Sequence, residues 1–146
     1  MKINRRVAVL VMGIGVGGFG LTLAAQNGET FKARLSAVPA DARTRADLAG
    51  SGSASAVLTG TKLVISGSFE GLRAAATTAG LHGGVAAGVA GPAVGDLTIS
   101  KSTSGTISGS IELTPQQLTI LRKGGLYVQI QSEKAPDGVL WGWLLK

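Results

Sequence analysis

The chain has no cysteine and a single histidine, His82, among its 146 residues. Without cysteine it forms no disulfide, zinc-thiolate site, iron–sulfur cluster or thiol nucleophile. A copper, zinc or iron site usually takes three or four protein ligands, so His82 would need carboxylates such as Asp96 or Glu133 beside it. We therefore predict no metal, no cofactor and no catalytic residue. We interpret His82 as an imidazole hydrogen-bonded to the backbone of the glycine-rich segment that follows it.

Other patterns of catalysis and of nucleic-acid binding are also missing. No Gly-x-Ser-x-Gly elbow precedes a helix, and Gly83-Gly84-Val85-Ala86-Ala87-Gly88 lacks the Gly-x-Gly start and the following helix of a dinucleotide loop. None of the eight acidic residues forms a pair marked by its sequence context. No basic run of five or more occurs, which argues against nucleic acid as a partner. We expect a protein that is not an enzyme.

The N-terminus has the pattern of a secretory signal peptide. A basic head with Lys2, Arg5 and Arg6 precedes an uncharged run from Val7 to Ala25. Small residues at its end predict cleavage near Ala24 or Ala25, with an uncleaved anchor as the alternative. Residues 1–25 are thus predicted as a Sec-type signal peptide, and we expect a periplasmic or secreted protein. Cleavage lowers the formal charge from +6 to +3 and leaves no segment expected to contact a membrane.

The remaining chain, residues 26–146, is predicted to form one all-β domain. Short segments of alternating apolar and polar residues recur between Gly, Ser, Thr, Pro and Asp residues, and they predict strands joined by turns. The predicted strands are residues 31–36, 53–58, 62–70, 77–82, 94–100, 106–113, 126–131 and 139–146. Seven or eight short strands with one brief helix indicate an antiparallel Greek-key β-sandwich or barrel.

One helix is predicted after Thr114. Thr114 suits the N-cap, Pro115 the first helical position, and Gln117 completes a Thr-x-x-Gln capping box. Leu118 and Leu121 are expected to bury one side of this helix, and the glycine pair 124–125 is expected to end it.

The order of these motifs resembles the CHRD domain family. The matching segments are residues 31–35, 38–39, 79–83, 91–92, 113–121, 125–131 and 136–138, with Gly142 and Leu144. The resemblance implies an immunoglobulin-like or superoxide-dismutase-like β-fold without a settled molecular activity. The chain departs from the family pattern at Gly80 and Gln131, where histidines are common, and at Val139, where glutamate is common.

The last predicted strand carries the two tryptophans of the chain. Alternation places Trp141 and Trp143 on one side and Leu140 and Leu144 on the other. In the family the leucine side resembles the core set, so the tryptophans are the candidate partner-binding residues, facing a glycan or an envelope protein. The alternative is that the indoles pack on a neighbouring loop or on the strand of Phe31.

We therefore expect an exported, non-enzymatic binding or assembly module. The alternative function is a degenerate metal-binding redox accessory protein related in shape to superoxide dismutase.

Overall fold

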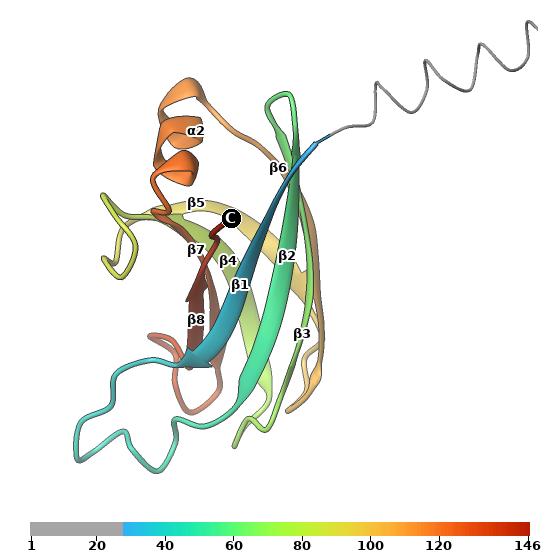
Figure 1. Cartoon of the computed structure of the whole chain (residues 1–146). Helices are drawn as coiled ribbons and strands as arrows, with labels where there is room; N and C mark the ends of the chain where they lie inside the picture. The colour runs from blue at the N-terminus through green and yellow to red at the C-terminus, as the bar shows by residue number, and fades with distance from the viewer. Residues whose placement is uncertain (1–27) are drawn as a thin grey trace, which may run out of the picture.

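The computed structural model describes residues 28–146, which form eight strands and one helix (Figure 1). The elements are β1 (Glu29–Ala37), β2 (Ser51–Thr59), β3 (Lys62–Glu70), β4 (Ala76–Gly83), β5 (Ala93–Ile99), β6 (Gly105–Glu112), α2 (Pro115–Arg122), β7 (Leu126–Ser132) and β8 (Leu140–Trp143). The predicted signal peptide, residues 1–25, and the start of the predicted domain at residue 26 lie outside the described residues.

The eight strands form a closed barrel in the order β1-β2-β3-β6-β5-β4-β7-β8, and β8 pairs back with β1. Every neighbouring pair is antiparallel. The prediction of an antiparallel all-β fold with one short helix is confirmed. The bounds of β3 are those predicted, and the bounds of the other strands up to β7 differ from the predicted ones by at most two residues.

Side chains from the inward face of each strand fill the interior of the barrel. In β1, Phe31, Ala33 and Leu35 are buried while Lys32 and Arg34 are exposed. The most deeply buried large side chains include Leu63, Ile65, Leu81, Ile107, Leu126, Val128, Ile130, Leu140 and Leu144. Since these residues come from strands all around the barrel, its interior is a packed core rather than a binding cavity.

The last strand is shorter than predicted, and it closes the barrel. β8 ends at Trp143, and beyond it Lys32 and Leu145 exchange two backbone hydrogen bonds, of 2.8 and 2.9 Å. Gly142 faces inward here, where a Cβ would overlap the carbonyl oxygen of Arg34 and lie 2.9 Å from Cδ2 of Leu35. The close approach of β8 to β1 therefore depends on the missing side chain of Gly142.

Helix α2 lies at the end of the barrel where β1 begins (Figure 1). The predicted capping box is present: the Thr114 hydroxyl accepts from the Gln117 amide, and the Gln117 side chain accepts from the Thr114 amide. Leu121 is fully buried and Leu118 half-buried, so the helix attaches mainly through Leu121. No helix in the described part of the chain has the length and apolar character needed to span a lipid bilayer.

We predict that Gly142→Ala destabilises the protein by about 1–3 kcal/mol or more, because the new methyl group must push β8 away from β1. Urea unfolding followed by circular dichroism measures the change. Ser36→Ala, at an exposed position of the same seam, serves as the control and should alter stability by less than about 0.5 kcal/mol. Equal stability of the two variants would contradict a closure that depends on Gly142.

Candidate binding site on the outer face of the barrel

Four aromatic rings line up across the outer face of strands β4, β7 and β8. The strand register pairs His82 with Tyr127 and Tyr127 with Trp143, and it pairs Gln129 with Trp141 in the next row. His82, Tyr127, Trp141 and Trp143 are called the aromatic cluster below. Side chains alternate between the two faces along each strand, and residues paired across strands point to the same face. All four rings therefore lie on one face of the sheet.

The rings of the aromatic cluster contact one another in sequence. His82 stacks on Tyr127 with centroids 5.2 Å apart, and Tyr127 lies 4.8 Å from Trp143. Trp141 meets Trp143 edge to face at 4.8 Å and Tyr127 edge to face at 6.0 Å. These separations are those of favourable aromatic pairs, so the cluster is a single packed unit on the outside of the barrel.

The two tryptophans face outward, while Leu140 and Leu144 are fully buried in the core, as the alternation predicts. Both indoles are half-buried, because they pack against each other and against Tyr127. The indole nitrogen Nε1 of Trp143 is buried without a hydrogen-bond partner. Each ring therefore leaves only part of its surface for contact with a ligand, and the partner-binding role of Trp141 and Trp143 stays a prediction.

The segment between β4 and β5, residues 84–92, covers part of the aromatic cluster and is called the glycine loop. Its two arms touch: a Cβ on Gly84 would overlap the carbonyl oxygen of Val89, and a Cβ on Gly91 would lie 2.8 Å from the Cα of Gly84. Tyr127 fastens the loop, since its hydroxyl accepts from the Gly91 amide at 3.0 Å and donates to the Gly91 carbonyl at 3.1 Å. These contacts bury Tyr127 although it points away from the core.

His82 is also fixed to this loop. Its Nδ1 donates to the carbonyl oxygen of Gly91 at 3.3 Å, which confirms the interpretation of a histidine bonded to loop backbone. A carbonyl only accepts, so this bond places a proton on Nδ1 and leaves the lone pair of the neutral ring on Nε2. A Cβ on Gly80 would lie 3.5 Å from Nε2, so the position where the family often has a histidine lies directly beside this nitrogen.

The acidic residues weighed as additional ligands do not surround His82. Asp96 lies opposite Gly80 on β5, in the row next to His82, whereas Glu133 follows β7 toward the far end of that strand. Gln131 forms a hydrogen bond with Thr78, two rows away from the pair of His82 and Tyr127. Within residues 28–146, no group of three His, Asp or Glu side chains is placed to hold a metal ion.

Polar side chains border the tryptophans. Gln129 lies opposite Trp141, and its amide Nε2 donates to the carbonyl oxygen of Asp137 at 2.7 Å. On the other side Ser36 lies opposite Trp141, and Arg34 is exposed on the same face of β1. The Gln129 amide on β7 and the Ser36 hydroxyl and Arg34 guanidinium on β1 thus lie on the two strands that pair with β8, beside the tryptophans.

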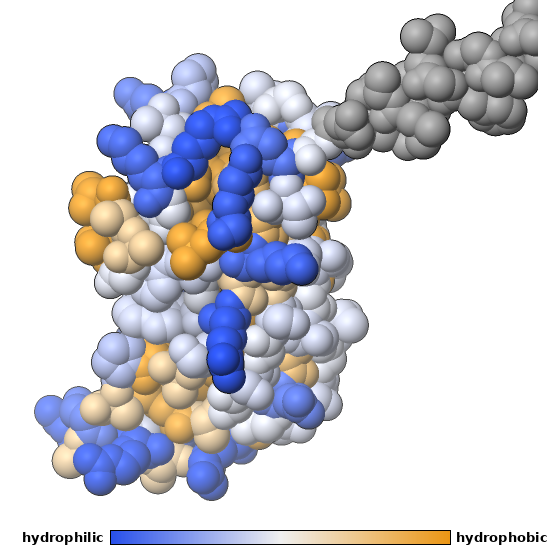
Figure 2. All heavy atoms as spheres, viewed as in Figure 1, coloured by the Kyte–Doolittle hydropathy of each residue, from blue (hydrophilic) through white to orange (hydrophobic). Residues whose placement is uncertain are grey.

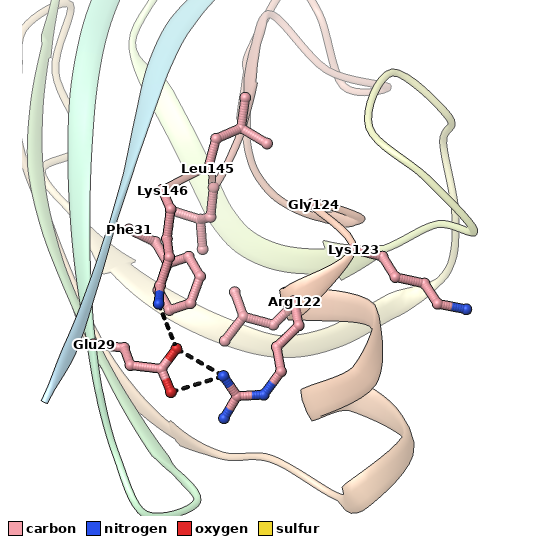
Figure 3. A pocket seen from close by; sticks show the side chains of 9 residues that line it. Glu29, Phe31, Arg122, Lys123, Gly124, Leu145 and Lys146 are labelled. Carbon is pink, nitrogen blue, oxygen red and sulfur yellow. Dashed lines mark hydrogen bonds and ion pairs between the residues drawn. The ribbon is translucent and has the colours of Figure 1, made fainter.

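A separate hollow of about 400 Å³ lies at the end of the barrel, between β1, α2 and the last residues of the chain (Figure 3). Glu29 accepts from Arg122 through both carboxylate oxygens at 2.7 Å, and Lys146 Nζ lies 3.0 Å from Oε2. Hydrogen bonds from Arg122 first and Lys146 second hold the pKa of Glu29 below its ordinary value. Lys146 Nζ also lies 5.7 Å from the ring centroid of Phe31.

A second hollow, of about 430 Å³, lies at the opposite end between the β1–β2 loop and the β7–β8 turn. Asp41 shapes its wall, since Oδ1 accepts from the amides of Thr44 and Arg43, and these bonds lower the pKa of the carboxyl, that from Thr44 the more. Each of these contacts lies within the loop, so Asp41 acts on local structure.

The sequence did not indicate the role of Tyr127 or the ion pairs of Glu29 with Arg122 and Lys146, which are called the Glu29 cluster below. Tyr127 lies in a predicted strand, but its hydroxyl meets Gly91, 36 residues earlier in the chain. Arg122 meets Glu29 across 93 residues. Both pairs are too far apart in the sequence for a local pattern to detect. The alternation of β7 does place Tyr127 on the outer face, because its neighbours Leu126 and Val128 belong to the core.

The chain belongs to the CHRD domain family, whose model matches residues 31–144. This match confirms the resemblance that the motifs indicated. No curated protein and no solved structure matches the chain significantly.

We predict that Tyr127→Phe loosens the glycine loop, because the Gly91 amide loses its acceptor while the ring stacking is kept. The free energy of unfolding should fall by about 1–3 kcal/mol. Hydrogen exchange read by NMR should show the Gly91 amide exchanging at least about tenfold faster. Amides of the β2–β3 hairpin, which does not touch the loop, are the internal control. Unchanged protection of Gly91 would show that Tyr127 does not hold the loop.

Proposed function

We propose that this CHRD-family chain is a non-enzymatic binding module whose contact surface is the outer face around Trp141 and Trp143. The observation that carries the proposal is the placement of both tryptophans of the chain side by side on the outside of a barrel whose core is filled by other residues. Tryptophan contributes more to binding than most residue types when it lies at the centre of an interface.

A saccharide is the ligand class that the surroundings of the indoles favour. Sugar rings present C–H faces that pack on aromatic rings and hydroxyl groups that need hydrogen-bond partners. Gln129, Ser36 and Arg34 supply an amide, a hydroxyl and a guanidinium beside the tryptophans. A protein partner of the cell envelope is the second ligand class.

The test is affinity capture from the native envelope with the mature chain as bait, compared with the Trp141→Ala, Trp143→Ala double variant. Loss of two tryptophan contacts should lower the affinity by at least about tenfold. Periodate treatment, which cleaves sugar diols, should abolish capture of a saccharide, while protease treatment should abolish capture of a protein.

The control variant is Val57→Ala, Val64→Ala, which shortens two exposed valines that face each other on β2 and β3. Trp141→Ala alone is a second probe, because it leaves the contact between Trp143 and Tyr127 in place. Circular dichroism verifies that each variant is folded. Capture that is equal for folded wild type and double variant would contradict the proposed surface.

We also propose that the chain is exported and processed near Ala24 or Ala25. The basic head, apolar run and small residues of the N-terminus support this. The mass of the mature chain prepared for the capture experiment measures the cleavage position.

The strand order β3-β6-β5-β4 supports a further proposal, that the barrel has Greek-key connections like those of superoxide dismutase.

The alternative function, a degenerate metal-binding redox accessory, would centre on Nε2 of His82. We predict less than one equivalent of copper or zinc in protein purified without a histidine tag, because His82 has no second imidazole beside it. Elemental analysis by mass spectrometry measures the content. Stoichiometric metal in the wild type that disappears in His82→Ala would establish the alternative in place of our proposal.

A further inference from the structure

Within residues 28–146, the glycine loop and its flanks form the longest segment that lacks polar side chains. From Gly83 to Gly95 no residue has a charged or hydrogen-bonding side chain. The tip of this segment projects into solvent, with Val85 80% exposed and Val89 42% exposed. Burial of these side chains against another surface is therefore favourable, and the fold itself does not provide that burial.

The apolar surface extends from the glycine loop to Leu145, which pairs with Lys32 beyond the end of β8. Leu145 is 48% exposed, and a Cβ on Gly124 would lie 2.8 Å from Cδ2 of Leu145 and 3.8 Å from Cβ of Ala87. Leu145 and Ala87 thus border the same glycine. We call Val85, Ala86, Ala87, Val89 and Leu145 the apolar patch. Figure 2 shows apolar atoms over this flank, with strongly hydrophilic side chains next to them over α2.

Basic residues border the apolar patch on the side of α2. Lys123 lines the hollow of about 320 Å³ between the glycine loop and α2, and it also lines the hollow that contains Glu29. Together these two hollows are lined by three basic residues, Arg122, Lys123 and Lys146, and by one acidic residue, Glu29. Figure 3 shows Lys123 pointing away from the Glu29 cluster.

We propose that the apolar patch docks on the surface of an anionic lipid bilayer. The valines at the tip enter the boundary between headgroups and acyl chains, and Lys123 contacts headgroup phosphates. An uncharged apolar projection next to an excess of cations is the combination that an anionic bilayer attracts, through apolar burial and surface potential together. This inference does not rest on the proposed role of the tryptophans.

The proposal departs from the expectation that the mature chain has no membrane contact. That expectation considered segments long enough to span a bilayer or to anchor the chain. A loop of nine residues is neither, and only its exposure in the folded barrel and its nearness to Lys123 and Leu145 make it a candidate for shallow contact.

The absence of cysteine permits a direct test on the full chain. Ala86→Cys places a unique thiol in the apolar patch, and Val64→Cys places one on β3 outside the patch as the matched control. Each is labelled with an environment-sensitive fluorophore and mixed with vesicles of phosphatidylcholine alone or with phosphatidylglycerol. We expect a blue shift and gain in intensity at position 86 on anionic vesicles only, and none at position 64.

Variants made in the Ala86→Cys chain test each component. Val85→Ser, Val89→Ser should weaken partitioning by at least about tenfold, and Lys123→Ala by about fivefold. Val57→Ser, Val64→Ser is the control for loss of exposed valine and should leave partitioning unchanged. Glu29→Gln frees Arg122 and Lys146 from their ion pairs and should strengthen it.

Three outcomes of the vesicle experiment would overturn the proposal. These are no response at position 86 on either vesicle, an equal response on neutral vesicles, and an equal response at position 64. A change at position 86 that requires an added envelope protein instead of lipid would assign the apolar patch to a protein partner and would also overturn it.

Discussion

The seam between β8 and β1 is the constraint on which the rest of this barrel depends. A four-residue strand joins the two ends of the sheet, and it approaches β1 closely because Gly142 has no side chain. Closure satisfies the backbone of both strands and buries Leu140 and Leu144. It also fixes which side chains of β8 remain outside. The same glycine that closes the core therefore sets the place of Trp141 and Trp143.

The outer face of the barrel is organised around Tyr127. Its ring joins His82 on one side to the tryptophans on the other, and its hydroxyl fastens Gly91 of the glycine loop. This face lacks the protection of a second layer of strands, so the glycine loop acts as a partial cover. A cover made of glycine, alanine, valine and one proline brings no polar side chain to the surface. The result is two adjoining regions of different character, an aromatic one and an aliphatic one.

The two regions and the basic end of α2 lie on neighbouring parts of one molecule, and each is suited to a different ligand chemistry. Our proposals assign a saccharide to the indoles beside amide and guanidinium groups, and a lipid surface to the exposed valines beside Lys123. Both chemistries occur in a cell envelope, the location that the N-terminal pattern of the sequence predicts.

The sequence by itself determined the strands, the capped helix, the family and the outward side of Trp141 and Trp143, because alternation, capping and turn chemistry are local properties. The partners of those side chains were decided only by the tertiary structure. Tyr127 reaches Gly91 and Arg122 reaches Glu29 because the barrel brings distant strands together, and no spacing along the chain encodes such a distance. The same holds for Leu145 and the glycine loop, which become one surface only when Gly124 places them side by side.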